Sequence, residues 1–319
     1  MKSTLAMNYR MLSSNIDRMS NRLYALRHQA ATGKQMNLPS DNPAGIRPVL
    51  KYRLQIKDVD RRLNQISMAL GEMEILDSSL DQVENILVVA KEAAIGAMNA
   101  VANQTDLETY ADRIGKLFDE MLQAANTQSN GKYLYSGYRE TTRPFTVNAA
   151  YDPAAYDPAD PMTWAAAYHG DANVKTVETV IGKSIQTALP GNDLFLGDAD
   201  NDGQLDPDGV DLFSMLKDLE ATVRNNDFTA MEQGLGKLEQ GADQVRRLRG
   251  RMGNNAWRIE QAGEHLETAS IEFKKIISSC EDADILEVFS RLVQHETAFE
   301  AALNVTTRIA RLSILDFMR

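Results

Sequence analysis

The longest pattern along the chain is helical. Between positions 44 and 102 hydrophobic residues recur every three or four positions, as in the run Ile66, Leu70 and Met73, which is the one-face pattern of an amphipathic helix. Proline costs about 3 kcal/mol inside a helix, and none occurs from 49 to 143. The pattern therefore predicts one helix over about 44–102, roughly 90 Å long at the usual helical rise.

Two further helical stretches follow. Residues 105–108 read Thr-Asp-Leu-Glu, a capping box that predicts a helix start, and an apolar stripe runs from there toward the Asn130-Gly131 turn signal. In the returning arm the apolar residues from Phe228 to Cys280 keep the helical period, and the arm contains no proline. We expect one long helix over that second arm.

Both ends of the chain are amphipathic almost to their tips. The N-terminal stripe alternates spacings of four and three residues, which is coiled-coil spacing. The C-terminal stripe is looser but runs almost to the last residue, where chain ends ordinarily fray. Because such stripes need a partner surface, we expect both to form subunit contacts. The predicted assembly residues are Leu5, Tyr9, Leu12, Ile16, Met19, Leu23, Leu26, Leu292, Phe299, Leu303, Ile309, Leu312 and Leu315.

The middle of the chain has a different composition. Eight of the 21 aromatic residues lie in 133–168, and β-branched stretches such as 174–181 alternate with turn signals, which predicts short strands. Within this region, 146–167 carries a repeated Tyr-Asp-Pro sequence that is typical of an exposed turn insert. We expect that insert to lie outside the core.

These patterns together predict a fold class and a division of the chain. The fold is expected to be mainly α, with a long antiparallel helical rod or coiled coil built from both chain ends and a small β-rich domain inserted in the middle. The expected parts are an N-terminal assembly helix and loop (1–43), long rod helices (44–132), a β-rich acidic insert domain (133–211), returning rod helices (212–280) and a C-terminal assembly helix (281–319).

Charge and hydropathy exclude several classes of partner. The chain has 45 acidic and 34 basic residues, a net charge of -11, so no overall basic field attracts nucleic acid. The charge is polarised, because 1–62 has twelve basic and four acidic residues whereas 148–211 has twelve acidic residues and two lysines. The start lacks the apolar core of a cleaved signal peptide, and no apolar run approaches a bilayer span. We expect neither membrane insertion nor signal cleavage.

Motifs for catalysis are absent from the sequence. There is no phosphate loop, no nucleophile elbow and no paired-histidine zinc motif, and the four histidines lie far apart. The single cysteine, Cys280, falls on the apolar face of its helix and is interpreted as a buried hydrophobic residue. We therefore predict no catalytic residues, no cofactor and no enzyme activity.

One acidic loop has partial metal-binding spacing. Asp198, Asp200, Asp202 and Asp206 occupy positions 1, 3, 5 and 9 of a calcium loop, with glycine at position 6. Position 12, where such a loop places a bidentate glutamate, is Gly209. We interpret the segment as a solvated acidic turn, and a weak calcium loop stays open as the alternative.

The sequence blocks near the two ends resemble the flagellin family. Residues 31–45 read ATGKQMNLPSDNPAG and residues 278–285 read SSCEDADI, similar to the family's N-terminal and C-terminal helical signatures. The Pro-Ser-Asp-x-Pro arrangement at 39–43 is similar to that of hook-filament junction members, whereas flagellins typically have Ser-Ala-x-Asp-Asp-Ala-Ala-Gly there. The residues that carry the resemblance are Pro39, Ser40, Asp41, Pro43, Glu281, Asp282 and Asp284.

The resemblance implies a non-enzymatic structural subunit of the bacterial flagellum. Such a subunit would be exported by the flagellar type III pathway, would lie outside the cell, and would join hook to filament through its terminal helices. The implied partners are further copies of this chain, hook-associated protein 1, flagellin and an export chaperone in the cytoplasm. Flagellin itself, the bulk filament subunit, stays open as the nearest alternative. A helical signalling adaptor and a calcium-dependent enzyme or adhesin are the alternatives from other classes.

Overall fold

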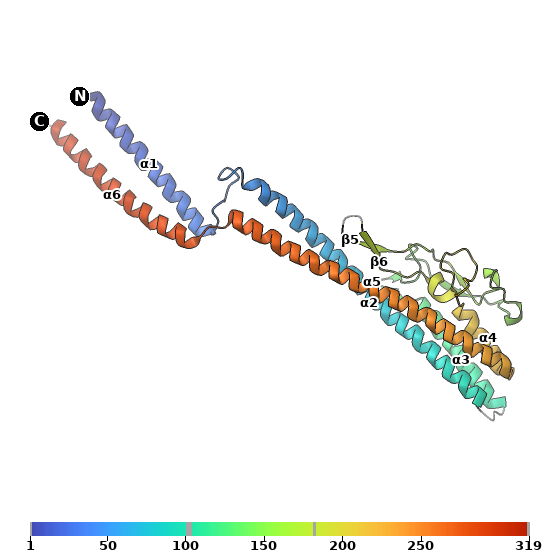
Figure 1. Cartoon of the computed structure of the whole chain (residues 1–319). Helices are drawn as coiled ribbons and strands as arrows, with labels where there is room; N and C mark the ends of the chain where they lie inside the picture. The colour runs from blue at the N-terminus through green and yellow to red at the C-terminus, as the bar shows by residue number, and fades with distance from the viewer. Residues whose placement is uncertain (1, 100–103, 181–182, 318–319) are drawn as a thin grey trace. The chain divides into compact units, whose positions relative to one another are not determined.

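A computed structural model describes residues 2–99, 104–180 and 183–317, with the side chains at 2–6, 8–9, 180 and 309–317 outside that description. The architecture is the mainly α one that the sequence predicts, with a small strand-containing middle region (Figure 1). The α-helices are α1 (Lys2–Thr32), α2 (Ile46–Asn99), α3 (Gln104–Ala125), α4 (Leu212–Arg224), α5 (Phe228–Glu281) and α6 (Ile285–Phe317).

Short strands and helical turns make up the middle region. Within the described residues the strands pair antiparallel as β1 with β2, β3 with β4 and β5 with β6. The strands are β1 (Gln128–Ser129), β2 (Lys132–Tyr133), β3 (Phe145–Val147), β4 (Ala166–Tyr168), β5 (Thr176–Val180) and β6 (Lys183–Gln186). The short helices are η1 (Pro153–Ala155), η2 (Pro161–Thr163) and the π-helical turn η3 (Asn192–Leu196).

The chain folds into two units, and α2 and α5 each contribute to both. The first unit consists of Met1–Asp60 and Glu267–Arg319. In this unit α1 and α6 lie side by side (Figure 1). The beginning of α2 contacts the end of α5 through the rings of Tyr52 and Phe273, whose centroids are 5.3 Å apart. In the described residues of the first unit the secondary structure is helical apart from an isolated β-bridge between Lys34 and Asp282.

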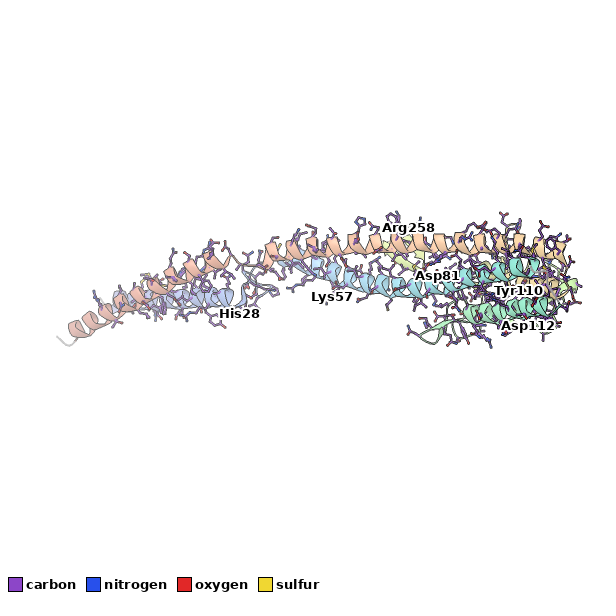
Figure 2. All side chains as sticks on the ribbon, turned by 90° about the horizontal axis from the view of Figure 1, so that it is seen from below. His28, Lys57, Asp81, Tyr110, Asp112 and Arg258 are labelled. Carbon is purple, nitrogen blue, oxygen red and sulfur yellow. The ribbon has the colours of Figure 1, made fainter. Side chains whose placement is uncertain are left out.

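The second unit, Arg61–Leu266, contains the main hydrophobic core. An aromatic cluster at its centre joins residues from a helix pair and from the middle region: Phe118 of α3 lies 5.8 Å from Phe213 of α4, and Phe213 lies 5.2 Å from Phe145 of β3. Figure 2 shows Asp112 on α3, and this carboxylate accepts a hydrogen bond of 2.8 Å from Arg224 at the end of α4. The middle region is thus packed onto the helices through shared aromatic residues.

Ion pairs join α2 and α5 in the second unit. The guanidinium of Arg249 on α5 donates to Asp77 and Asp81 of α2 at 2.8 Å each, and Arg246 pairs with Glu84 at 3.2 Å. Figure 2 labels Asp81 on its helix. Because these side chains are partly exposed, each pair contributes at most about 1 kcal/mol. Because Arg246 pairs with Glu84 and Arg249 pairs with the earlier Asp77 and Asp81, the two helices run antiparallel.

Several helix ends follow from local sequence. Gly33 has φ +69°, the left-handed conformation in which a glycine commonly follows the last residue of a helix. It terminates α1. The Asp211 side chain accepts hydrogen bonds from the first-turn N–H groups of α4, and Asp284 does the same at the start of α6, as N-cap residues do.

The expectation that 146–167 lies outside the core is wrong for part of the segment. Trp164 is 2 % exposed and belongs to the central core. The backbone N–H of Ala165 donates to the buried Ser214 hydroxyl of α4 at 2.9 Å. The Tyr151 hydroxyl donates to the Asp218 carboxylate of the same helix at 2.6 Å. Composition alone suggested an exposed turn because these aromatic anchors alternate with solvated Asp-Pro pairs.

Candidate assembly interface

The terminal helices α1 and α6 pack on each other within the chain. Leu23 and Leu26 of α1 are 5 % and 4 % exposed, and Val288 of α6 is also buried. Arg27 of α1 donates to Glu296 of α6 at 2.9 Å. Part of the predicted assembly stripe is therefore already covered by the chain's own partner helix.

The other predicted assembly residues fall into three groups. Leu12, Ile16, Met19, Leu292 and Phe299 are half-buried. Leu303 is exposed. The side chains of Leu5, Tyr9, Ile309, Leu312 and Leu315 lie outside the described residues. The structure thus brings the middle of both stripes together and leaves their outer members unassigned.

A groove of about 840 Å³ lies between α1 and α6. Its apolar lining includes Leu12, Ile16 and Met19 from α1 and Ala302 and Val305 from α6. Arginine and histidine side chains flank this lining. The groove is lined by half-buried residues of the stripe, so apolar surface remains for a partner to cover.

A second apolar face of α6 is separate from its buried side. Leu286, Phe289 and Val293 are 83 %, 50 % and 61 % exposed. Their spacing of three and four residues puts them on one helical face, whereas the buried Val288 and half-buried Leu292 face α1. Sequence reasoning missed this face because it assigned α6 a single stripe. The signal was present as a second set of apolar residues at helical spacing.

On α1 a comparable exposed residue is Tyr24, which is 74 % exposed one position after the buried Leu23. Met7 and Met11 are exposed on the same helix at 68 % and 57 %. Both terminal helices therefore have an inner side used within the chain and an outer side that carries large apolar groups.

Residues of the N-terminal and C-terminal motif blocks meet at one contact, called the joint below, between the α1–α2 connection and the end of α5. Glu281, at the last position of α5, is 4 % exposed, and its carboxylate accepts from Lys34 at 3.0 Å and from Arg53 at 2.6 Å. The main chain closes the same joint, because Gln35 N–H donates to the Glu281 carbonyl at 2.8 Å and Ala283 N–H donates to the Gly33 carbonyl at 2.9 Å. The joint ties the connection between α1 and α2 to the connection between α5 and α6.

The other motif residues shape the two connecting loops. Asp41 accepts hydrogen bonds from the backbone N–H of Asn37 and Leu38 at 3.0 and 2.7 Å, and Asp282 accepts from the Ser278 hydroxyl. Pro39, Ser40 and Pro43 are exposed. The structure thus gives Asp41, Asp282 and Asp284 local backbone and capping roles, and it gives Glu281 a role between segments distant in sequence.

The aspartate loop brings together three of its four predicted carboxylates. Asp198, Asp200 and Asp202 have carboxylate oxygens within 4.8 Å of one another. Asp206 instead accepts a hydrogen bond from the Ala199 N–H at 2.9 Å. Burial raises the pKa of the Asp198 carboxyl, although the N–H groups of Gly203 and Asp202 favour its charged form. Three aspartates without the bidentate glutamate form an incomplete calcium loop.

No described helix is both long enough and apolar enough to cross a bilayer.

The paired terminal helices and their joint coincide with the regions that match known families. The bacterial flagellin N-terminal helical region matches residues 3–140, and the bacterial flagellin C-terminal helical region matches residues 235–318. The chain belongs to the flagellin family.

Individual relatives extend the similarity over the whole chain. The flagellar hook-associated protein 3 of Salmonella typhimurium is 23 % identical over 335 aligned positions that cover 100 % of both chains. The flagellar filament 41 kDa core protein of Borreliella burgdorferi is 23 % identical over 81 % of each chain. The crystal structure of hook-associated protein 3 from Legionella pneumophila superimposes with a TM-score of 0.57 at 14 % identity, covering 72 % of this chain and 97 % of that one. Within the flagellin family, these relatives support a chain that is like hook-associated protein 3.

Proposed function

We propose that this chain is a structural subunit of the flagellar hook-filament junction, and that it acts by assembly and not by catalysis. The observation that carries the proposal is the pair of terminal helices, which are joined within the chain and still expose apolar side chains on their outer faces. End-to-end similarity to a hook-associated protein 3 supports the junction over the bulk filament. The partners are expected to be further copies of the chain, hook-associated protein 1 and flagellin.

The proposed mechanism is burial of the outer face of α6 against a neighbouring subunit. Full burial of a leucine, phenylalanine or valine side chain contributes about 1.5–3 kcal/mol. Because Leu286, Phe289 and Val293 are between half and four-fifths exposed, covering all three would contribute about 3–6 kcal/mol per subunit. Repeated around an assembly, such contacts offset the loss of translational and rotational freedom on association.

The location and export of the chain follow from the same proposal. A junction subunit lies outside the cell, and an export chaperone would cover its apolar terminal helices in the cytoplasm before secretion. Exposed apolar faces of this kind mark protein contact sites or aggregation sites. We infer that these faces are the reason a chaperone is needed.

The test replaces outward residues, because a charge at Leu23 would also break the packing of α1 on α6. The double variant Leu286→Asp, Phe289→Asp is expected to give a folded monomer but no filament on the hook, with unpolymerised flagellin released into the medium. Gln294→Asp is the matched control, since Gln294 is an exposed polar residue of α6 that lies outside the face formed by Leu286 and Val293. Normal swimming of the double variant would show that the outer face of α6 is not the assembly contact.

A deletion strain separates the junction from the bulk filament subunit. Loss of a junction subunit leaves hooks that fail to retain flagellin, which then accumulates outside the cell. Loss of the filament subunit leaves hooks and no flagellin at all. Finding this chain as the main component of sheared filaments would favour the flagellin alternative.

A further inference from the structure

A two-residue turn joins β1 to β2. Ser129 pairs with Lys132, and the turn residues between them are Asn130 with φ +52° and Gly131 with φ +77°. Both backbones are left-handed, which is the type I′ geometry that favours Asn-Gly in hairpins. The sequence contains this dipeptide once.

The turn leaves the side-chain amide of Asn130 and the backbone N–H of Gly131 accessible to water. Asn130 and Gly131 are exposed. Among the described residues, no hydrogen bond engages the Asn130 amide or the Gly131 N–H. Asn126, in contrast, bonds the carbonyl and the N–H of Phe145, and Asn148 donates to the carbonyl of Trp164 at 2.9 Å. The surrounding structure holds those two amides in place and leaves Asn130 free.

We propose that Asn130 is a site of spontaneous deamidation and isomerisation. The Gly131 backbone nitrogen loses its proton to water or hydroxide and attacks Cγ of Asn130, forming a C–N bond. The bond from Cγ to the side-chain nitrogen breaks, and that nitrogen takes up a proton and leaves as ammonia. Water then opens the resulting succinimide ring at either carbonyl, which gives aspartate or isoaspartate with no change of oxidation state.

Opening of the hairpin frees the Asn130 backbone to rotate, which lets the Gly131 nitrogen approach Cγ. Each strand contributes two residues to the pair, and an isolated two-stranded hairpin is marginally stable in water. Local openings of such segments cost little free energy compared with global unfolding. Glycine at 131 adds no side chain to hinder the attack. The hairpin is therefore expected to open often enough for the reaction to proceed in the folded protein.

The isoaspartate product changes the turn permanently. It adds one carbon to the main chain between the two strands, so the two-residue turn cannot close again in the register of Ser129 with Lys132. Lys132 also pairs with Glu140 at 2.5 Å, and the Tyr133 N–H donates to the Glu140 carbonyl at 2.8 Å. Both contacts directly follow the turn and are expected to loosen with it.

Ageing the full-length folded protein at neutral and mildly alkaline pH tests the proposal. Peptide mapping with isoaspartate detection should show conversion of Asn130 roughly tenfold or more faster than that of Asn148, whose amide is held by the carbonyls of Met162 and Trp164 and which is followed by alanine. The rate should rise with pH because the amide must lose its proton. Backbone hydrogen exchange across 128–133 should increase in step with conversion.

The matched control is Asn130→Gly, which accepts the left-handed turn but has no side-chain amide to release. It should keep the hairpin protected over the same ageing period. Conversion of Asn130 no faster than that of Asn148 in the folded protein, measured beside a urea-unfolded sample in which Asn130 reacts readily, would overturn the proposal. Equal loss of hairpin protection in Asn130→Gly would overturn the link between the reaction and the turn.

Discussion

The joint at Glu281 provides the sharpest test of how the first unit is held together. Replacing Glu281 by glutamine keeps the size of the side chain and removes its charge. The carboxylate is buried, and it is the shared partner of Lys34 at 3.0 Å and Arg53 at 2.6 Å. Glutamine retains one carbonyl oxygen for Arg53 but places an amide that donates hydrogen bonds beside two cations. The substitution therefore weakens both ionic contacts and leaves the main-chain bonds intact.

The size of the free-energy loss depends on how well water hydrates the two cations once the carboxylate is gone. Removing one partner of a fully buried ion pair costs about 3–5 kcal/mol, because the remaining charge stays buried. The side chains of Lys34 and Arg53 are 42 % and 49 % exposed, so water rehydrates them and most of that penalty disappears. Charged hydrogen bonds contribute about 1.5–3 kcal/mol each before this discount. We expect a net loss of about 2 kcal/mol, which multiplies the open population of the joint roughly 30-fold.

Hydrogen exchange followed by mass spectrometry is the appropriate assay. Peptides that cover 33–38 and 281–284 should exchange faster in Glu281→Gln, while peptides from the core of the second unit should not change. Glu287→Gln is the control, since it removes a carboxylate from an exposed pair with Arg291 on α6. Unchanged exchange at 33–38, or an equal increase in the control, would refute the reasoning that the buried carboxylate holds the joint.

Two further predictions concern the second unit. Burial raises the pKa of Asp211 to about 6. The folded state therefore binds this proton more tightly than the unfolded chain does. The resulting stabilisation of the folded state is fully present below about pH 4 and is lost as the pH rises through about 6. The free energy of unfolding should therefore fall between about pH 4 and pH 7, a slope that thermal denaturation of Asp211→Asn should lack. Calorimetric titration should find calcium binding no tighter than about 10⁻⁴ M, because Gly209 supplies no bidentate ligand. Low-micromolar binding that Asp198→Ala abolishes would contradict this.

The sequence by itself determined the helical elements and the class of protein. The proline-free periodic arms predict helices over 44–102 and 228–280, and the structure has them at Ile46–Asn99 and Phe228–Glu281. Helical period and proline exclusion are local properties, so they can be read without knowing what the helix touches. The motif blocks likewise identified the family, because their residues stand together in the sequence.

Only the tertiary structure decided which surfaces are covered. Leu23 and Leu286 both occupy apolar positions in a helical pattern, yet Leu23 is buried within the chain and Leu286 is 83 % exposed. Glu281 read as one acidic residue of a motif, and its burial depends on Lys34, 247 residues away in sequence. Trp164 read as part of an exposed insert, and it lies in the core. Periodicity shows that a face is apolar, but the partner that covers it is set by contacts between distant segments.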